Sequence, residues 1–231
     1  MLLNIGESLW AHEALIHEVV LPFVQIPMWH RMTVVRLASG EVLLHSPTLL
    51  DVELRAAIDE LGPVAAVIAP SWWHDLYLEE TLSIYPRAGL FVAPVLQRSH
   101  RCSSAQPLGE TAPALWSAQI DQTRIEGIAL HFDEFAFYHR ASRSLILADL
   151  LSNDDAFVGG LLRRFVRVAS GSGCSFPRAF RPVVVNRRRF RASILRVLEW
   201  DFDRIVVGHG SIVATDGKRA FRNAFQWLLK S

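Results

Sequence analysis

The sequence has few cysteines and no long apolar run. Only two of its 231 residues are cysteine, Cys102 and Cys174, and they lie far apart without a CxxC pair. This excludes a disulfide framework and a zinc knuckle, and it fits a reducing, cytoplasmic location. No stretch approaches the roughly 18 apolar residues that a membrane helix needs, because Pro70 interrupts the richest one, VAAVIAPSWW. The first residues carry Glu7 and Glu13 and no basic flank, so we expect neither a signal peptide nor a membrane partner.

The chain also lacks an excess of charge of either sign. Its 24 basic and 23 acidic residues give a formal net charge of +1, so no strong overall field attracts nucleic acid or an anionic membrane. Arginines are nevertheless clustered, since RRFVRV at 163–168 and NRRRFR at 186–191 together hold seven guanidinium groups. Such clusters recognise phosphate or RNA in some proteins, but most basic helix faces are simply solvated. Nucleic-acid binding therefore stays a minor hypothesis, and a solvated surface is preferred.

The residues that are present indicate one sizeable globular domain over residues 1–231. Hydrophobic residues make up 51% of the chain and charged residues 20%, which is enough to bury a large core. In the first half, predicted strands alternate with helices, which indicates a mixed sheet covered by helices. The predicted elements are a hairpin (31–37 and 41–46), a helix (48–62), a buried strand (63–69), a helix (75–85) and a strand (89–94).

The second half of the chain predicts a different arrangement. Three strand-like segments at 124–130, 134–140 and 144–149 are separated by short turns and form a meander. Helices are expected at 156–169 and 186–200, followed by the strand RIVVGHG and a final helix at 218–230. The fold class is therefore α/β (α+β), with two mixed sheets packed face to face and helices outside.

Groups that bind metals occur where predicted strands end. His131 follows RIEGIAL, Asp149 ends SLILAD and His209 follows RIVVG, while His74 and Asp75 come shortly after PVAAVIA. Because the ends of neighbouring strands converge at one edge of a sheet, we expect these side chains to share a site. Zinc and iron are bound by imidazole and carboxylate groups, usually three or four of them, with one position open to water in catalytic sites.

The order of these segments also carries a family resemblance. An N-terminal hairpin, an apolar strand leading to a His/Asp pair, a histidine eighteen residues before an aspartate, and a late VVGHG follow one another over almost the whole chain. This succession resembles the metallo-β-lactamase superfamily, most specifically in HFDEFAFYHRASRSLILADLL. Within it the sequence is most similar to the DUF4336 branch, through RMTVVRLASGEVLLHSP, AGLFVAP and EWDFDRIVVGHG. The resemblance implies a four-layer αββα sandwich with a binuclear metal site.

The sequence departs from the family at its principal motif. The family's HxHxDH would follow PVAAVIA, and the corresponding residues here are Pro70, Trp72, His74 and Asp75. Two histidines are absent, so His131 is the one ligand left for the first metal. A single imidazole does not hold a divalent ion against water.

The positions of the second metal keep groups that can bind an ion. They are His74, where the family usually has aspartate, Asp75, where it usually has histidine, and then Asp149 and His209. We therefore expect one zinc or iron ion, or none if the site is eroded. The exchange of aspartate for histidine at position 74 moves the metal-binding atom by about an ångström, whereas metal–ligand distances vary by only about 0.2 Å. The ion should bind more weakly than in binuclear relatives.

Each of these residues also has a purely structural explanation. His209, between glycines that supply backbone freedom, fits a cap for the following segment. Asp149 fits a helix N-cap, and His131 has Asp133 or Glu134 as a hydrogen-bond partner. His74 and Asp75 fit the start of a helix, where Asp75 favours the helix dipole.

Two functions from different classes therefore stay open. In the first, a metal-dependent hydrolase uses Asp149 and His74 as catalytic residues, and a water acidified by the ion attacks an ester, lactone, thioester or phosphoester. In the second, a non-catalytic binding or scaffold protein has lost its metal site. The missing histidines favour the second function, and the replacements that can bind an ion favour the first. A small-molecule substrate or ligand is expected in either case, and the sequence fixes neither its identity nor the oligomeric state.

Overall fold

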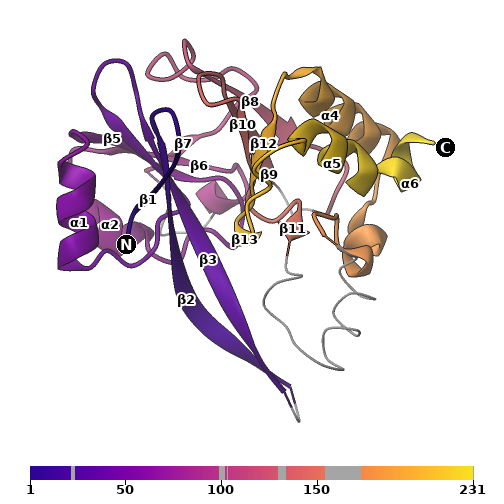
Figure 1. Cartoon of the computed structure of the whole chain (residues 1–231), viewed down its shortest axis with the longest axis horizontal. Coiled ribbons are helices and arrows are strands. Elements are labelled where there is room, and N and C mark those ends of the chain that lie inside the picture. Colours follow the sequence, from indigo (N-terminus) through magenta and orange to yellow (C-terminus); the bar gives the residue numbers. More distant parts are fainter. Residues whose placement is uncertain (22–23, 99–101, 103, 130–133, 154–172, 231) are drawn as a thin grey trace.

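Two mixed β-sheets form the centre of the molecule (Figure 1). The computed structural model describes residues 1–21, 24–98, 102, 104–129, 134–153 and 173–230. The larger sheet has the order β1-β2-β3-β4-β5-β6-β7 and the smaller one the order β12-β10-β9-β8, and β11 pairs with β13. The strands are β1 (Leu3–Gly6), β2 (Leu9–Leu21), β3 (Val24–Arg36), β4 (Val42–His45), β5 (Val64–Ala69), β6 (Gly89–Val92), β7 (Gln106–Pro107), β8 (Ile120–Ile125), β9 (Glu134–His139), β10 (Ser144–Ile146), β11 (Ser152–Asn153), β12 (Arg204–Val206) and β13 (His209–Gly210).

The sheets are covered by helices on their outer faces. The α-helices are α1 (Val52–Asp59), α2 (Leu78–Ile84), α4 (Arg187–Glu199), α5 (Gly217–Ala224) and α6 (Gln226–Leu229), and 3-10 helices occupy η1 (Leu96–Arg98) and η5 (Arg178–Val183). Side-chain caps start two of the helices: Asp51 accepts a hydrogen bond from the backbone of Leu54 in α1, and Asn186 accepts one from Arg189 in α4. None of the helices in these ranges is long and apolar enough to cross a membrane.

Three apolar clusters hold the layers together. One lies between the sheets and includes Ile68 of β5, Phe137 of β9 and the fully buried Trp116. A second joins the larger sheet to α1 and α2, and a third joins the smaller sheet to α4, α5 and α6. Burying one such large side chain stabilises the fold by about 1.5–3 kcal/mol. The result is an αββα sandwich with two mixed sheets, which confirms the expected fold class.

Strand directions bring several strand ends to the same region. β4, β5 and β6 run parallel, and so do β10 and β12. VAAVIA is apolar at every position because β5 is a central strand covered on both faces. The residues that follow β5, β10 and β12 are those that the sequence marks as candidates for a site.

Some predicted elements differ from the observed ones. The strand predicted at 124–130 is wrong in position, because β8 ends at Ile125 and the chain turns at Gly127, whose φ is +83°. The helix predicted at 75–85 begins at Leu78, and the last helix is interrupted at Phe225 between α5 and α6. The long β2–β3 hairpin was not predicted before residue 31. The helix predicted at 156–169 lies outside the described residues.

Candidate metal centre

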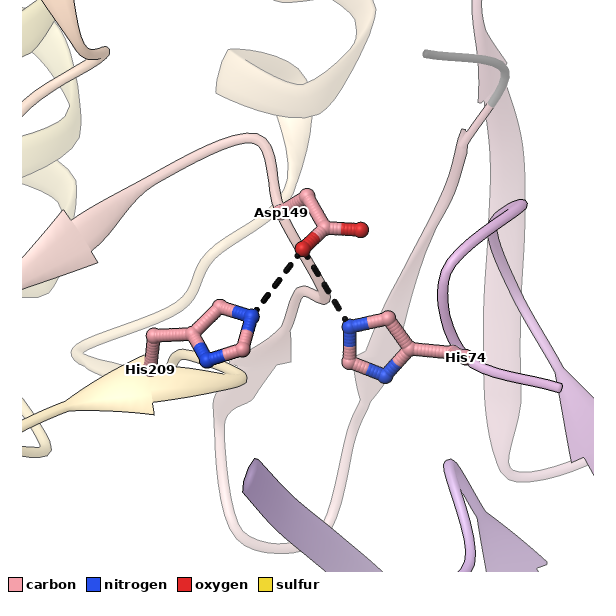
Figure 2. Close-up of side chains that lie close together, drawn as sticks. All are labelled: His74, Asp149 and His209. Carbon is pink, nitrogen blue, oxygen red and sulfur yellow. Dashed lines mark hydrogen bonds and ion pairs between the residues drawn. The ribbon is translucent and has the colours of Figure 1, made fainter. Parts of the chain in front are cut away.

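His74, Asp149 and His209 converge from three separate segments, the third being the start of the two-residue strand β13. They follow β5, β10 and β12, and each offers one ligand atom within 4.8 Å of the other two. Figure 2 shows both imidazoles pointing toward the same oxygen of Asp149. The side chain of His74 is 1% exposed, that of Asp149 13% and that of His209 19%, so His74 forms the buried side of the group.

The two carboxylate oxygens of Asp149 contact different residues. Its Oδ1 lies 3.3 Å from His74 Nε2 and 3.1 Å from His209 Nε2, while its Oδ2 accepts a hydrogen bond of 2.6 Å from the Ser71 hydroxyl. Burial alone would raise the pKa of Asp149, but the two imidazoles hold that pKa well below its usual value. Asp149 is therefore a carboxylate at neutral pH, with one oxygen fixed by Ser71 and the other directed at the histidines.

Glu134 supports the segment that carries Asp149. Its carboxylate is buried and accepts hydrogen bonds of 2.8 Å from the Ala148 N–H and 2.9 Å from the Asp149 N–H. Burial, followed by the nearby charge of Asp149, raises the pKa of Glu134. From the sequence alone, Glu134 is expected only as a hydrogen-bond partner for His131. A carboxylate at the start of the largely apolar strand EFAFYH is the signal of this supporting role.

The ring of His209 is held in one orientation. Its Nδ1 lies 2.5 Å from the carbonyl oxygen of Trp29. A carbonyl oxygen only accepts, so Nδ1 carries the proton and donates it. In the neutral ring, Nε2 then presents its lone pair to Asp149 Oδ1, and a proton or a cation is needed between these two atoms. A metal-binding histidine is oriented in the same way by a backbone carbonyl behind it.

Arg31 fastens the loop of His209 to β3. Its backbone N–H donates to the Gly208 carbonyl at 3.0 Å, and its guanidinium donates to the carbonyls of Val207 and Gly210. The same guanidinium pairs with Glu13 of β2. Burial lowers the pKa of Arg31 to about 10, which leaves it charged at neutral pH. The sequence pattern predicts a strand at Arg31 and no further role for this residue.

The glycines on either side of His209 are required by close packing. A Cβ on Gly208 would lie 2.6 Å from the Ala148 carbonyl oxygen and 3.0 Å from Cε1 of His74. Gly210 has a φ of +87°, and a Cβ there would meet the backbone of Asn153 at 2.4 Å. Only glycine therefore lets this loop approach the segment of Asp149 so closely.

A further histidine, His30, packs against His74. The ring centres are 4.4 Å apart, and His30 Nε2 donates to the Ser46 carbonyl at 3.1 Å. Burial, then the neighbouring His74 and His209, lowers the pKa of His30 well below its usual value, so the ring is neutral. His74 Nδ1 is buried, and no residue in the described part of the chain hydrogen-bonds to it. His30 was not predicted, because its strand begins earlier than the sequence indicated.

The other candidate residues lie elsewhere. Asp75 is half-buried and lines a cavity of about 240 Å³ beside α2, together with Leu78 and Cys102. It is not part of the three-donor group. Pro70 and Trp72 have no side-chain atom that can bind a metal ion at the motif positions. His131 lies outside the described residues.

An αββα sandwich with histidine and aspartate donors at its strand ends defines the class of the metallo-β-lactamase fold. Solved metallo-β-lactamases match the chain over nearly its full length. The structure of FIM-1 from Pseudomonas aeruginosa in its mono-zinc form has a TM-score of 0.63 at 12% identity, covering 100% of this chain and 95% of that one. A metallo-β-lactamase from Pontibacter korlensis gives 0.63 at 13%, with 100% and 99% covered. One from Hirschia baltica gives 0.62 at 11%, with 99% and 97% covered. At such identities the likeness establishes the fold.

The chain belongs to the DUF4336 family, a domain of unknown function, whose model matches residues 7–157. The matched range includes His74 and Asp149, whereas His209 lies beyond it. No curated protein matches the chain.

Proposed function

We propose that this protein is a metal-dependent hydrolase with a single ion, zinc or iron, held by His74, Asp149 and His209. The observation that carries the proposal is the convergence of two imidazole nitrogens and one carboxylate oxygen within 4.8 Å. Three such donors meet the minimum for a catalytic zinc site and also match the two-histidine, one-carboxylate set that binds iron. The motif positions of the first metal hold Pro70 and Trp72, whose side chains cannot bind a metal ion, and this supports one ion and not two.

The surroundings of the three donors fit an ion. The Trp29 carbonyl holds the proton of His209 on Nδ1, so the lone pair of Nε2 can bind an ion. Ser71 hydrogen-bonds Asp149 Oδ2 and leaves Oδ1 to bind the same ion. A bound divalent ion would supply Lewis acidity and lower the pKa of water at the site. Asp149 and His209 are the more exposed donors, so a substrate carbonyl or phosphoryl group would approach from their side. The substrate class we propose is an ester, lactone, thioester or phosphoester.

One observation favours a second candidate, a non-catalytic binding or scaffold protein. If His74 Nε2 binds an ion, the proton moves to Nδ1, which is buried and has no acceptor among the described residues. Metal-binding histidines normally donate this second N–H, and losing such support costs about 10- to 100-fold in affinity. Without an ion, His74 donates from Nε2 to Asp149, and the cluster is a structural hydrogen-bond network.

Hydrolase assays with defined metal loading separate the two candidates. Wild type and Asp149→Asn, which keeps the side-chain shape and removes the charge, would be loaded with zinc or iron and assayed. The substrates are an aryl acetate, a lactone, an acyl thioester and an aryl phosphodiester. We expect one class to be cleaved, with the activity abolished by a chelator, restored by metal, and reduced about 100-fold or more in kcat/KM by Asp149→Asn. Loaded wild type that cleaves none of the four classes contradicts the hydrolase.

A further inference from the structure

A second concave site lies among the C-terminal helices. A cavity of about 370 Å³ opens between residues 174–181 and the helices α5 and α6, which are grouped at the C-terminal end of the molecule in Figure 1. Its lining includes Arg178, Arg181, Asn223, Gln226 and Trp227. None of the three metal-centre residues borders it. Its size falls at the small end of the cavities that hold organic ligands, about 300–1,000 Å³.

Two guanidinium groups pack on the indole ring of Trp227, that of Arg181, which lines the cavity, and that of Arg187, which does not. The guanidinium carbon of Arg181 lies 4.8 Å from the centre of the indole ring, and that of Arg187 lies 5.1 Å from it. Arg187 also donates a hydrogen bond of 2.6 Å to the Trp227 carbonyl, and the buried Phe176 stacks on the indole at 5.9 Å. Cation–π attraction thus fixes the positions of two positive charges that repel each other.

Basic residues outnumber acidic ones three to one in the C-terminal segments that form this cavity. Residues 173–230 contain ten arginines, two lysines and four acidic residues. Two of these acids are already paired, Asp201 with Arg143 and Asp216 with Arg219. Within the described ranges, neither Arg178 nor Arg181 forms an ion pair. The acidic residues are concentrated elsewhere, with eight of them and a single arginine in residues 41–80. A chain of net charge +1 therefore has a strongly positive region around this cavity.

We infer that this cavity binds a small organic phosphate, such as a sugar phosphate or a mononucleotide. Guanidinium groups match the oxygens of a phosphate in pairs of parallel hydrogen bonds, which makes Arg178 and Arg181 the anchors. The side-chain amides of Asn223 and Gln226 supply donors and acceptors for hydroxyl groups of the organic part.

The charge of Cys174 and the volume of the cavity both fit a small anionic ligand. Burial raises the pKa of the Cys174 thiol to about 12, so this residue adds no negative charge to the cavity. The cavity volume sets the ligand at about the size of one nucleotide. The inference stands apart from the proposed hydrolase, because it uses none of the metal-centre residues.

Calorimetric titration of the whole protein tests this site. The probes are inorganic phosphate, ribose 5-phosphate, AMP and a 20-nucleotide RNA, each titrated at low salt and at about 0.15 M ionic strength. We expect one equivalent of an organic phosphate to bind, with inorganic phosphate competing for it. Arg181→Gln and Arg178→Gln should each weaken binding by about tenfold or more, because each removes charged hydrogen bonds.

Arg188→Gln is the matched control. It removes the same charge from the neighbouring helix α4, and Arg188 does not line the cavity. We expect it to change the affinity by less than about twofold, with thermal unfolding of all three variants close to wild type. Three results overturn the inference: no organic phosphate binds, the RNA binds while small phosphates do not, or Arg188→Gln weakens binding as much as Arg181→Gln.

Discussion

Replacing Gly208 by alanine tests whether the loop of His209 needs its close approach to the segment of Asp149. The added Cβ would lie 2.6 Å from the backbone oxygen of Ala148 and 3.0 Å from Cε1 of His74. The backbone oxygen has no flexible side chain that could move aside, so one of the two segments must shift.

The expected size of the effect follows from two opposing contributions. Overpacking of this kind costs about 1–3 kcal/mol, and the reduced freedom of the unfolded chain returns about 0.4–1 kcal/mol. The free energy of unfolding should therefore fall by about 1–2 kcal/mol, which lowers Tm by roughly 2–8 °C in a chain of this size. The shift also displaces His74 from Asp149, so zinc affinity should fall by about tenfold or more.

Thermal unfolding and a zinc competition assay measure both effects. Gly109→Ala is the control, because a Cβ there meets nothing closer than the Thr111 carbonyl oxygen at 4.0 Å. We expect its Tm to equal or slightly exceed that of wild type. If Gly208→Ala unfolds at the wild-type temperature and binds zinc as wild type does, the close approach at Gly208 is not needed.

Other changes probe the support of the site and the pH response. Ser71→Ala should weaken zinc binding by about 10- to 100-fold, measured by chelator competition, because Asp149 Oδ2 loses its 2.6 Å hydrogen bond; unchanged affinity refutes this. Arg31→Met removes the guanidinium hydrogen bonds to the Val207 and Gly210 carbonyls, so the backbone hydrogen exchange of residues 207–210 should increase. Wild-type protection of these residues in the variant would show that Arg31 does not hold this segment. His139 is fully buried, and burial lowers its pKa to about 4 from 6.5. It therefore stays neutral in the folded state, so its contribution to stability is complete above pH 6.5 and is lost as the pH falls toward 4. His139→Phe should remove a slope of about 1.4 kcal/mol per pH unit between pH 6 and 4 in urea unfolding, and an unaltered slope would show the histidine titrates normally.

The sequence predicts the architecture where hydrophobic pattern and turn residues agree. VAAVIA is apolar throughout and forms the central strand β5. The helix predicted at 48–62 is observed as the shorter α1, which starts only after the cap at Asp51 and buries Leu54 and Ile58. The prediction of a strand at 124–130 is wrong because apolar residues on both sides of Gly127 read as one continuous strand. In the structure the chain turns at Gly127, where it packs against the start of α4. A Cβ on Gly127 would lie 2.3 Å from the Asn186 carbonyl.

The site is predictable only in part, for a physical reason. His74, Asp149 and His209 could be proposed because each follows a strand whose end is visible in the sequence. Their supports could not, because His30 and Arg31 act through long-range contacts to residues far along the chain. Such contacts leave no periodic signal in the sequence. Glu134 is the exception, since a carboxylate within an apolar strand already requires hydrogen-bond partners.

Elemental analysis of the purified protein tests the central claim most directly. Wild type, His209→Ala and the control His12→Ala would be purified side by side under zinc or iron supplementation, with unfolding curves to establish that each is folded. His12 bonds the N-terminal residue and lies outside the three-donor group. We predict close to one equivalent of metal in wild type and in His12→Ala, and almost none in His209→Ala. Folded wild type without metal, or with two equivalents, would contradict a single ion held by His74, Asp149 and His209.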